Sequence, residues 1–151
     1  MINYIPKYFT LTEFCHSNTA LKNDIENIPT WEHLDKLLKG AKVLDLYRDA
    51  LGEAMHITSA YRCSKLNKLV GGSETSHHSK GDAFDIQIGK RTKADAIRLF
   101  NFIKEYNYNN SINIDQCFLE HNSKTKSWWV HIGFNFYEPH KMRNQYGEIV
   151  K

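Results

Sequence analysis

Two histidines and one aspartate have the types and spacing of ligands for a single metal ion. His78 and Asp85 stand seven positions apart, and His131 follows later in the chain. A catalytic zinc ion takes three protein ligands of the His and Asp/Glu type and leaves its fourth position to water, a count that these residues fit. Gly81 lies midway between the first two, where its freedom at positive φ would let the chain reverse. His77 is an alternative ligand at this turn, and zinc is the default metal for such ligands.

Five motifs follow one another along the chain, at residues 8–14, 57–62, 66–73, 78–85 and 129–131. The fourth is the pattern His-x-x-Gly-x-Ala-x-Asp, and the fifth is an aromatic-Val-His segment. Together they resemble the zinc D-alanyl-D-alanine peptidases, over roughly residues 8 to 134. Agreement of several motifs in kind and order makes the resemblance specific. It implies His78, Asp85 and His131 as the zinc ligands and selects His78 over His77.

This family includes carboxypeptidases, the vancomycin-resistance dipeptidases and phage endolysins. The resemblance implies a zinc-dependent metallopeptidase, a hydrolase that cleaves stem peptides of bacterial cell-wall peptidoglycan. Two kinds of bond stay open, that of a D-Ala-D-Ala carboxypeptidase and that of an endolysin-type endopeptidase, for example between L-alanine and D-glutamate. Loops around Arg62 and after Asn135 would set the choice. The start of the sequence has no signal-peptide pattern, which favours a phage-type lysin.

Peptide hydrolysis at zinc needs a carboxylate that takes a proton from water. In the vancomycin-resistance dipeptidases a Glu stands three residues before the last His, but Trp128 occupies that place here. Glu120 is the predicted base, because it ends a strand expected to pair with that of His131. Its segment also resembles the strand of related family members, and of the hedgehog domain, that ends in a Glu beside zinc. The alternative is that Glu120 only pairs with a turn lysine such as Lys124 or Lys126.

Two further residues are implied as substrate-binding by the resemblance. Arg62 matches the arginine that contacts the substrate near the scissile bond, where a guanidinium holds a carboxylate or stabilises an oxyanion. A surface salt bridge is the alternative. Ser76 matches a serine near the substrate, or it caps the turn. His121 adjoins the predicted base as a possible proton donor, with an exposed turn position as the alternative.

A protein of a different class fits the same motifs. A non-catalytic zinc-containing module that binds the cell wall would keep the metal for stability, as a hedgehog-like domain can. Trp128 in place of a Glu keeps this alternative open. It predicts zinc retention and peptidoglycan binding without bond cleavage, and no loss of function when Glu120 is replaced.

The composition is that of a globular protein, with 41% hydrophobic and 25% charged residues in a chain of 151. This length predicts a single domain over residues 1–151. The resemblance implies a core at about 8–134, which leaves a C-terminal extension at 135–151. The net charge of +3 comes from scattered Lys and Arg. Neither nucleic acid nor a membrane is therefore an expected partner, and we expect a monomer.

The three cysteines, Cys15, Cys63 and Cys117, include no Cys-x-x-Cys pair. An odd and sparse set of this kind predicts reduced thiols and synthesis in a cytosol. Without a leader pattern, the product is expected to be cytoplasmic as synthesised. Action on the cell wall would then require release of the holin type.

The resemblance implies an α+β fold of the hedgehog and D-Ala-D-Ala-peptidase type. In this fold a small, mostly antiparallel sheet holds the metal on one face and packs helices against the other. Capping signals and periodicity predict helices at 11–17, 31–51 and 64–70, and one from 93 to a break at 107–110. Alternating residues predict strands at 55–61, 83–88, 114–120 and 127–134, the last two as an antiparallel hairpin.

The predicted core includes one stripe of the long helix, from Trp31 to Leu51. In the helix that begins after Thr92, the predicted buried face is Ala96, Ile97, Phe100 and Ile103. Residues after Asn135 show no clear period and are expected to pack loosely.

Overall fold

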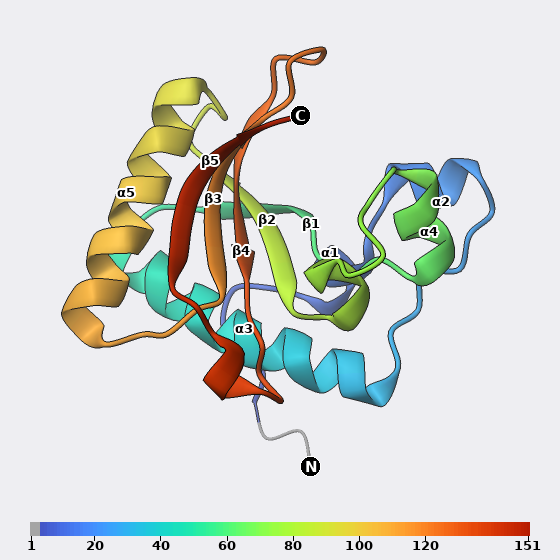
Figure 1. Ribbon diagram of the computed structural model, residues 1–151, viewed down its shortest axis with the longest axis horizontal. Coiled ribbons are helices and arrows are strands. Elements are labelled where there is room, and N and C mark those ends of the chain that lie inside the picture. Colours follow the sequence, from blue (N-terminus) through green and yellow to red (C-terminus); the bar gives the residue numbers. More distant parts are fainter. Residues whose placement is uncertain (1–3) are drawn as a thin grey trace.

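Five strands form one sheet in the order β1-β2-β4-β3-β5 (Figure 1). The computed structural model describes residues 4–151. The strands are β1 (Met55–Ser59), β2 (Ala83–Ile88), β3 (Gln116–His121), β4 (Trp128–Gly133) and β5 (Gln145–Val150). The helices are α1 (Leu11–Cys15), α2 (Asn18–Lys22), α3 (Trp31–Leu51), α4 (Ser64–Leu69) and α5 (Lys93–Asn110), with short 3₁₀ turns η1 (His77–Lys80) and η2 (Pro139–Lys141). Only β3 and β5 pair in parallel, so the predicted α+β fold with a mostly antiparallel sheet is confirmed.

The register of the central strands places the predicted ligands together. Asp85 on β2 lies directly opposite His131 on β4, and Phe118 on β3 lies opposite His131 from the other side. Successive side chains of a strand point to opposite faces. Asp85, His131 and Phe118 therefore share one face, while Phe84 and Ile132 on the other face are fully buried in the core.

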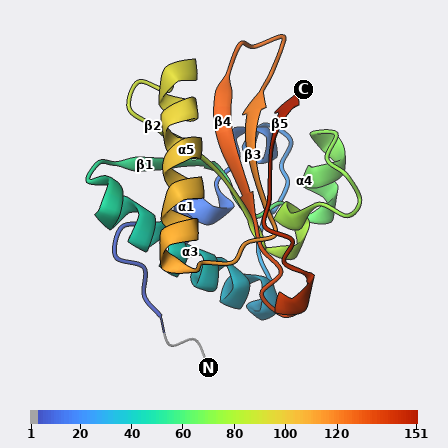
Figure 2. The same ribbon diagram turned by 60° about the vertical axis from the view of Figure 1, so that its left-hand side comes forward.

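The core lies on the face of the sheet that α3 and α5 cover (Figure 2). α3 begins where the Thr30 hydroxyl accepts a hydrogen bond from the His33 amide, and it ends at Gly52, whose φ is 75°. The side chains that this helix buries completely are Leu37, Ala41, Leu44 and Tyr47. Burying a large apolar side chain contributes about 1.5–3 kcal/mol. This packing supports the sheet whose opposite face carries the site.

The prediction of a buried position is wrong for two residues. Trp31 is 78% exposed and Ile97 is 37% exposed. Trp31 is the first residue of α3, and Figure 1 shows that the N-terminal turns of this helix extend beyond the strands. Ile97 lies one residue past Ala96, about 100° around the helix from it. The buried face of α5 instead runs through Ala96, Leu99, Ile103 and Asn107.

The segment after Asn135 also differs from its prediction. Instead of packing loosely, it forms η2 and then β5, which pairs with β3 from Gln116↔Gln145 to His121↔Val150. The predicted helix at 11–17 ends at Cys15, and the separate helix α2 follows it. The three cysteines are free, as predicted. No helix within residues 4–151 has the length and apolar character needed to cross a membrane.

Candidate metal centre and cleft

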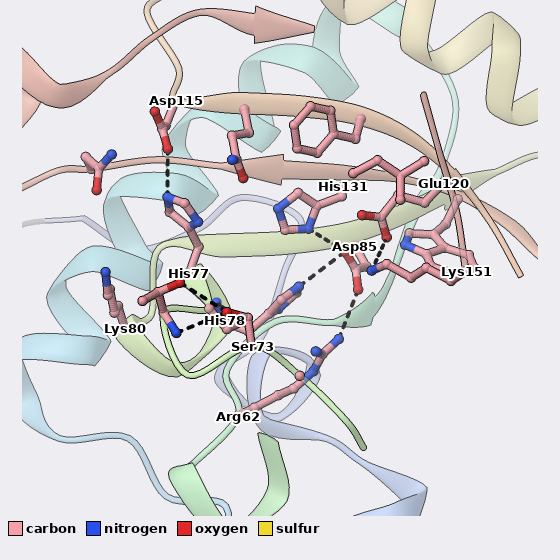
Figure 3. Close-up of a pocket in the computed structure, with 18 of the residues that line it drawn as sticks. Arg62, Ser73, His77, His78, Lys80, Asp85, Asp115, Glu120, His131 and Lys151 are labelled. Atoms are coloured by element: carbon pink, nitrogen blue, oxygen red, sulfur yellow. Dashed lines mark hydrogen bonds and ion pairs between the residues drawn. The ribbon is translucent and has the colours of Figure 1, made fainter. Parts of the chain in front are cut away.

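A cleft of about 1060 Å³ opens on the face of the sheet opposite the helical core. Strands β2, β3 and β4 contribute Asp85, Phe118, Glu120, Trp129 and His131 to it, and η1 and the segment between α4 and η1 close one side. The segment 135–151 contributes a further wall through Asn135, His140, Lys141, Arg143, Ile149 and Lys151. Figure 3 shows the polar side chains that point into this cleft.

The three predicted ligands converge in this cleft. Nδ1 of His131 lies 2.9 Å from Oδ1 of Asp85, and Nε2 of His78 lies 3.3 Å from the same oxygen. The three residues are buried, and one ligand atom of each lies within 4.8 Å of the others. Around a tetrahedral ion with bonds of about 2.0–2.1 Å, ligand atoms stand roughly 3.3 Å apart. The geometry and the donor types thus fit a zinc ion held by His78, Asp85 and His131.

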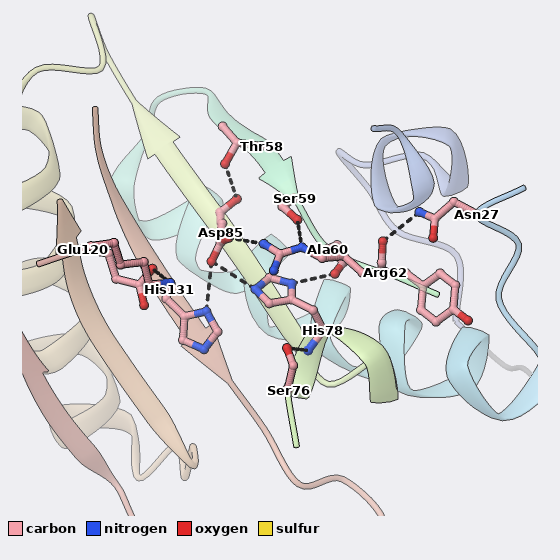
Figure 4. A network of polar contacts seen from close by, with 12 residues as sticks. Asn27, Thr58, Ser59, Ala60, Arg62, Ser76, His78, Asp85, Glu120 and His131 are labelled. Carbon is pink, nitrogen blue, oxygen red and sulfur yellow. Dashed lines mark hydrogen bonds and ion pairs between the residues drawn. The ribbon is translucent and has the colours of Figure 1, made fainter. Parts of the chain in front are cut away.

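Neighbouring groups fix the orientation of these side chains (Figure 4). Nδ1 of His78 donates a hydrogen bond of 2.6 Å to the carbonyl oxygen of Ala60, and Nε2 faces Asp85. The guanidinium of Arg62 donates to Oδ2 of Asp85 at 3.1 Å and to Oγ of Ser59 at 2.9 Å. Such contacts behind metal ligands fix their tautomer and orientation.

The protonation states also suit a metal site. Burial favours the neutral form of Asp85, but the charge and hydrogen bonds of His78 and His131 outweigh it and hold the pKa of Asp85 well below 3.8. Burial lowers the pKa of His78 below 6.5, against the pull of Asp85. Near neutral pH the site thus presents a carboxylate and a neutral imidazole at His78, which are the forms that bind metals.

The turn between η1 and β2 depends on Gly81. Its φ is 74°, and a Cβ placed on it would lie 2.7 Å from the carbonyl oxygen of His33 on α3. The turn therefore requires a left-handed residue without a side chain. At the start of η1, Oγ of Ser76 accepts a hydrogen bond from the amide of His78 at 3.2 Å. Ser76 both caps the turn and lines the cleft, so the structure is compatible with either of its predicted roles.

Glu120 faces the cleft but binds a different lysine from those weighed in the sequence. It lies opposite Trp129, two positions from the row of His131, and is 3% exposed. Its Oε2 accepts a hydrogen bond of 2.7 Å from Nζ of Lys151, which follows β5. The turn residues Lys124 and Lys126 form no ion pair with it within residues 4–151. A buried carboxylate is thus positioned beside the predicted ligands.

The next pair of the hairpin after Glu120 and Trp129, which is His121 and Trp128, lies outside this arrangement. Trp128 stands three positions from His131, and an odd spacing in a strand reverses the face. It packs against the core side, where its ring stacks on His121 at 4.2 Å between centroids. Neither residue lines the cleft. Because position 128 faces away from the cleft, a Trp in place of a Glu there does not affect the carboxylate of Glu120, which faces the cleft.

Sequence reasoning missed a second polar cluster in the cleft. Nε2 of His77 lies 2.8 Å from Oδ2 of Asp115, and Arg143 donates to both oxygens of Asp115 at 2.7 and 2.8 Å. His77 therefore points to Asp115 instead of joining the ligand group. These three residues come from η1, the start of β3 and the approach to β5. No short motif links them, so no local signal in the sequence could have found the cluster.

The fold and the site together define an α+β protein with a buried group of two histidines and one aspartate, the donor types that metal-dependent hydrolases use. A family model described as Peptidase M15 matches residues 7–132, which is most of the chain. The chain therefore belongs to this family of peptidases, and the resemblance stated from its motifs is confirmed. No curated protein matches the chain significantly.

Proposed function

We propose that the protein is a zinc-dependent metallopeptidase that hydrolyses peptide bonds in the stem peptides of bacterial peptidoglycan. The observation that carries this proposal is the convergence of His78, Asp85 and His131 on one point of a cleft, in a chain of the Peptidase M15 family. We further propose a phage-type lysin that is made in the cytoplasm, acts as a monomer, and reaches the wall after release of the holin type.

The groups of the cleft divide the chemistry among them. Zinc bound by His78, Asp85 and His131 would supply a Lewis acid that polarises the scissile carbonyl and activates water. Glu120, on the same face, takes the proton of the attacking water and passes it to the leaving amine. Lys151 holds the Glu120 carboxylate in place through its 2.7 Å hydrogen bond.

Arg62 has a double position in this proposal. Its Nε and Nη2 are engaged by Ser59 and Asp85, and the side chain still lines the cleft. We propose that it fixes the Asp85 ligand and presents its remaining donors to the substrate near the scissile bond. Ser76 lies beside it at the rim as a further substrate contact.

The proposal is tested by incubating the zinc-loaded protein with purified peptidoglycan and with a free stem pentapeptide, and by identifying the products by mass spectrometry. We expect new peptide termini, whose masses name the bond. Glu120→Gln should retain zinc and lose at least about 100-fold in rate, since general base catalysis is worth about 10²–10⁴. Glu148→Gln, on the exposed side of β5, is the matched control and should retain activity.

Two results would contradict this assignment in different ways. A fully zinc-loaded protein that binds several wall types without producing new termini would be the non-catalytic binding module. Undiminished cleavage by Glu120→Gln would keep the peptidase and remove Glu120 as its base.

A further inference from the structure

The cleft contains more positive than negative side chains, and not all of the positive ones have an ion-pair partner. Its carboxylates are Asp85, Asp115 and Glu120, and its Lys and Arg residues are Arg62, Lys80, Lys141, Arg143 and Lys151. Arg62, Arg143 and Lys151 each bind one of those carboxylates, and Lys141 binds Glu138. Lys80 has no ion-pair or hydrogen-bond partner for its ammonium group within residues 4–151. Its charge is therefore available to a ligand of the cleft.

Arg143 lines the same cleft and is held rigidly there. Its Nε and Nη2 donate to Asp115, whose side chain is 1% exposed, while the Arg143 side chain is 56% exposed. Nη1 has no acceptor in the described part of the chain. A guanidinium fixed in this way offers a donor to an anion with little loss of side-chain freedom.

His77 connects Lys80 and Arg143 in space. Lys80 is three residues further along η1, and residues i and i+3 of a 3₁₀ helix lie on the same side of it. Nε2 of His77 contacts the same Asp115 oxygen that accepts from Nη2 of Arg143. Figure 3 shows Lys80, His77 and Asp115 on one side of Asp85, with Glu120 and Lys151 on the other.

The sheet register gives the distance of this cluster from the metal ligands. Phe118 lies opposite His131, and Asp115 is three positions before it on the same chain. At a rise of about 3.3 Å per residue, Asp115 lies about 10 Å along the sheet from the row of the ligands. An extended peptide has the same rise, so this distance corresponds to about three residues of a bound substrate.

We propose that Lys80 and Arg143 form a subsite for a carboxylate of the substrate, about 10 Å from the scissile carbonyl. The inference deepens the proposed function, on which it rests, because it names the substrate as an acidic peptide. The carboxylate belongs to a residue about three positions from the cleaved bond, or to a longer side chain of a nearer residue. Lys80 and Arg143 bind it without contacting the reacting atoms and determine specificity.

Equilibrium binding tests the subsite separately from catalysis. The probes are the stem pentapeptide L-Ala-γ-D-Glu-L-Lys-D-Ala-D-Ala and two versions of it, one amidated at the glutamate α-carboxylate and one at the C-terminus. Each is titrated calorimetrically into zinc-loaded Glu120→Gln protein, which keeps the peptide intact. The titrations are repeated with Lys80→Met, Lys80→Arg and Lys124→Met added. Lys124 is exposed in the β3-β4 turn and outside the cleft, so its loss removes the same charge elsewhere.

We expect one of the two amidations to weaken binding at least about tenfold, the effect of one charge-assisted hydrogen bond. That difference should vanish in Lys80→Met and persist in Lys80→Arg and Lys124→Met. Equal binding of all three peptides, no binding of any, or an amidation effect that survives Lys80→Met would overturn the subsite. Selective binding combined with no cleavage by the unsubstituted protein would keep the subsite and reject the peptidase.

Discussion

At the scale of single residues, two adjacent histidines of one turn point to two different carboxylates. His77 and His78 stand in η1, and successive residues of a 3₁₀ helix point about 120° apart. His78 therefore faces Asp85, while His77 faces Asp115. The choice between two neighbouring imidazoles follows from the geometry of the turn and requires no difference in their chemistry.

This geometry predicts different effects of replacing the two histidines. His78→Ala should lower zinc affinity by more than about 100-fold, because even the loss of a group behind a ligand costs 10–100-fold. His77→Ala should still bind one zinc ion per chain. Zinc content after dialysis against a competing chelator, measured by mass spectrometry, checks both. Equal affinities in the two variants would remove His78 from the ligand set.

The sequence could predict that His78 and Asp85 lie together in the cleft, because they fall with Gly81 within one short motif. The ion pairs around the ligands could not be predicted in the same way. His77 with Asp115 joins η1 to the residue before β3, and Glu120 with Lys151 joins β3 to the residue after β5. These segments are far apart in the chain and become neighbours only in the assembled sheet. Such contacts depend on the three-dimensional path and have no periodic signal.

At the scale of elements, the turn between η1 and β2 packs against α3 and leads into the strand that carries Asp85. Gly81 has a left-handed backbone and packs against the His33 carbonyl, whereas Gly52 at the end of α3 has a similar φ and nothing within 4 Å of its position for a Cβ. A comparison of the two glycines can therefore distinguish the cost of a left-handed backbone from the cost of a steric clash.

Alanine at these two positions should have unequal effects. Gly52→Ala is expected to lower the free energy of unfolding by about 1–2 kcal/mol, the cost of a left-handed residue with a Cβ. Gly81→Ala should lower it more, because its Cβ would collide with the His33 carbonyl at 2.7 Å. Urea unfolding of the metal-free proteins measures both changes. A smaller loss in Gly81→Ala than in Gly52→Ala would show that the turn relaxes easily.

Element boundaries could be predicted where local chemistry marks them. Thr30 and Gly52 delimit α3, and both signals are visible in the sequence. β5 could not be predicted, because Gln145–Val150 is a partly exposed edge strand with Gly147 at its middle, and its partner β3 is set by the chain path. The exposure of Trp31 was equally invisible, since periodicity defines a helix face but not how far the sheet beneath it extends.

At the scale of the whole molecule, one buried and two half-buried histidines make folding sensitive to acid. Burial lowers the pKa values of His33, His77 and His78 below 6.5 in the folded state. The unfolded chain therefore binds more protons than the folded chain as the pH falls below 6.5. The stability contributed by these neutral side chains is complete above pH 6.5 and is lost as the pH falls toward their folded pKa values.

We expect the free energy of unfolding of the metal-free protein to fall between pH 7 and pH 5, by at most about 1.4 kcal/mol per pH unit for the buried His78 and by less for His33 and His77, which solvent partly screens. His77→Asn should make the free energy of unfolding depend less on pH below 7. Above pH 7, the pH dependence of the variant and that of the unsubstituted protein should be the same. Urea unfolding in the presence of a chelator at a series of pH values measures it. Stability that increases on acidification over this range would contradict the inferred neutral histidines.

The end of β5 has a practical consequence for anyone who handles the protein. Lys151 binds Glu120, so any polypeptide joined after it emerges at the rim of the cleft. A polyhistidine tag placed there would bring competing imidazoles next to the proposed metal ligands and crowd the entry of the proposed cell-wall substrate. The N-terminal segment is the better point of attachment, because its Tyr4 and Lys7 contact Asp45 on α3, outside the cleft.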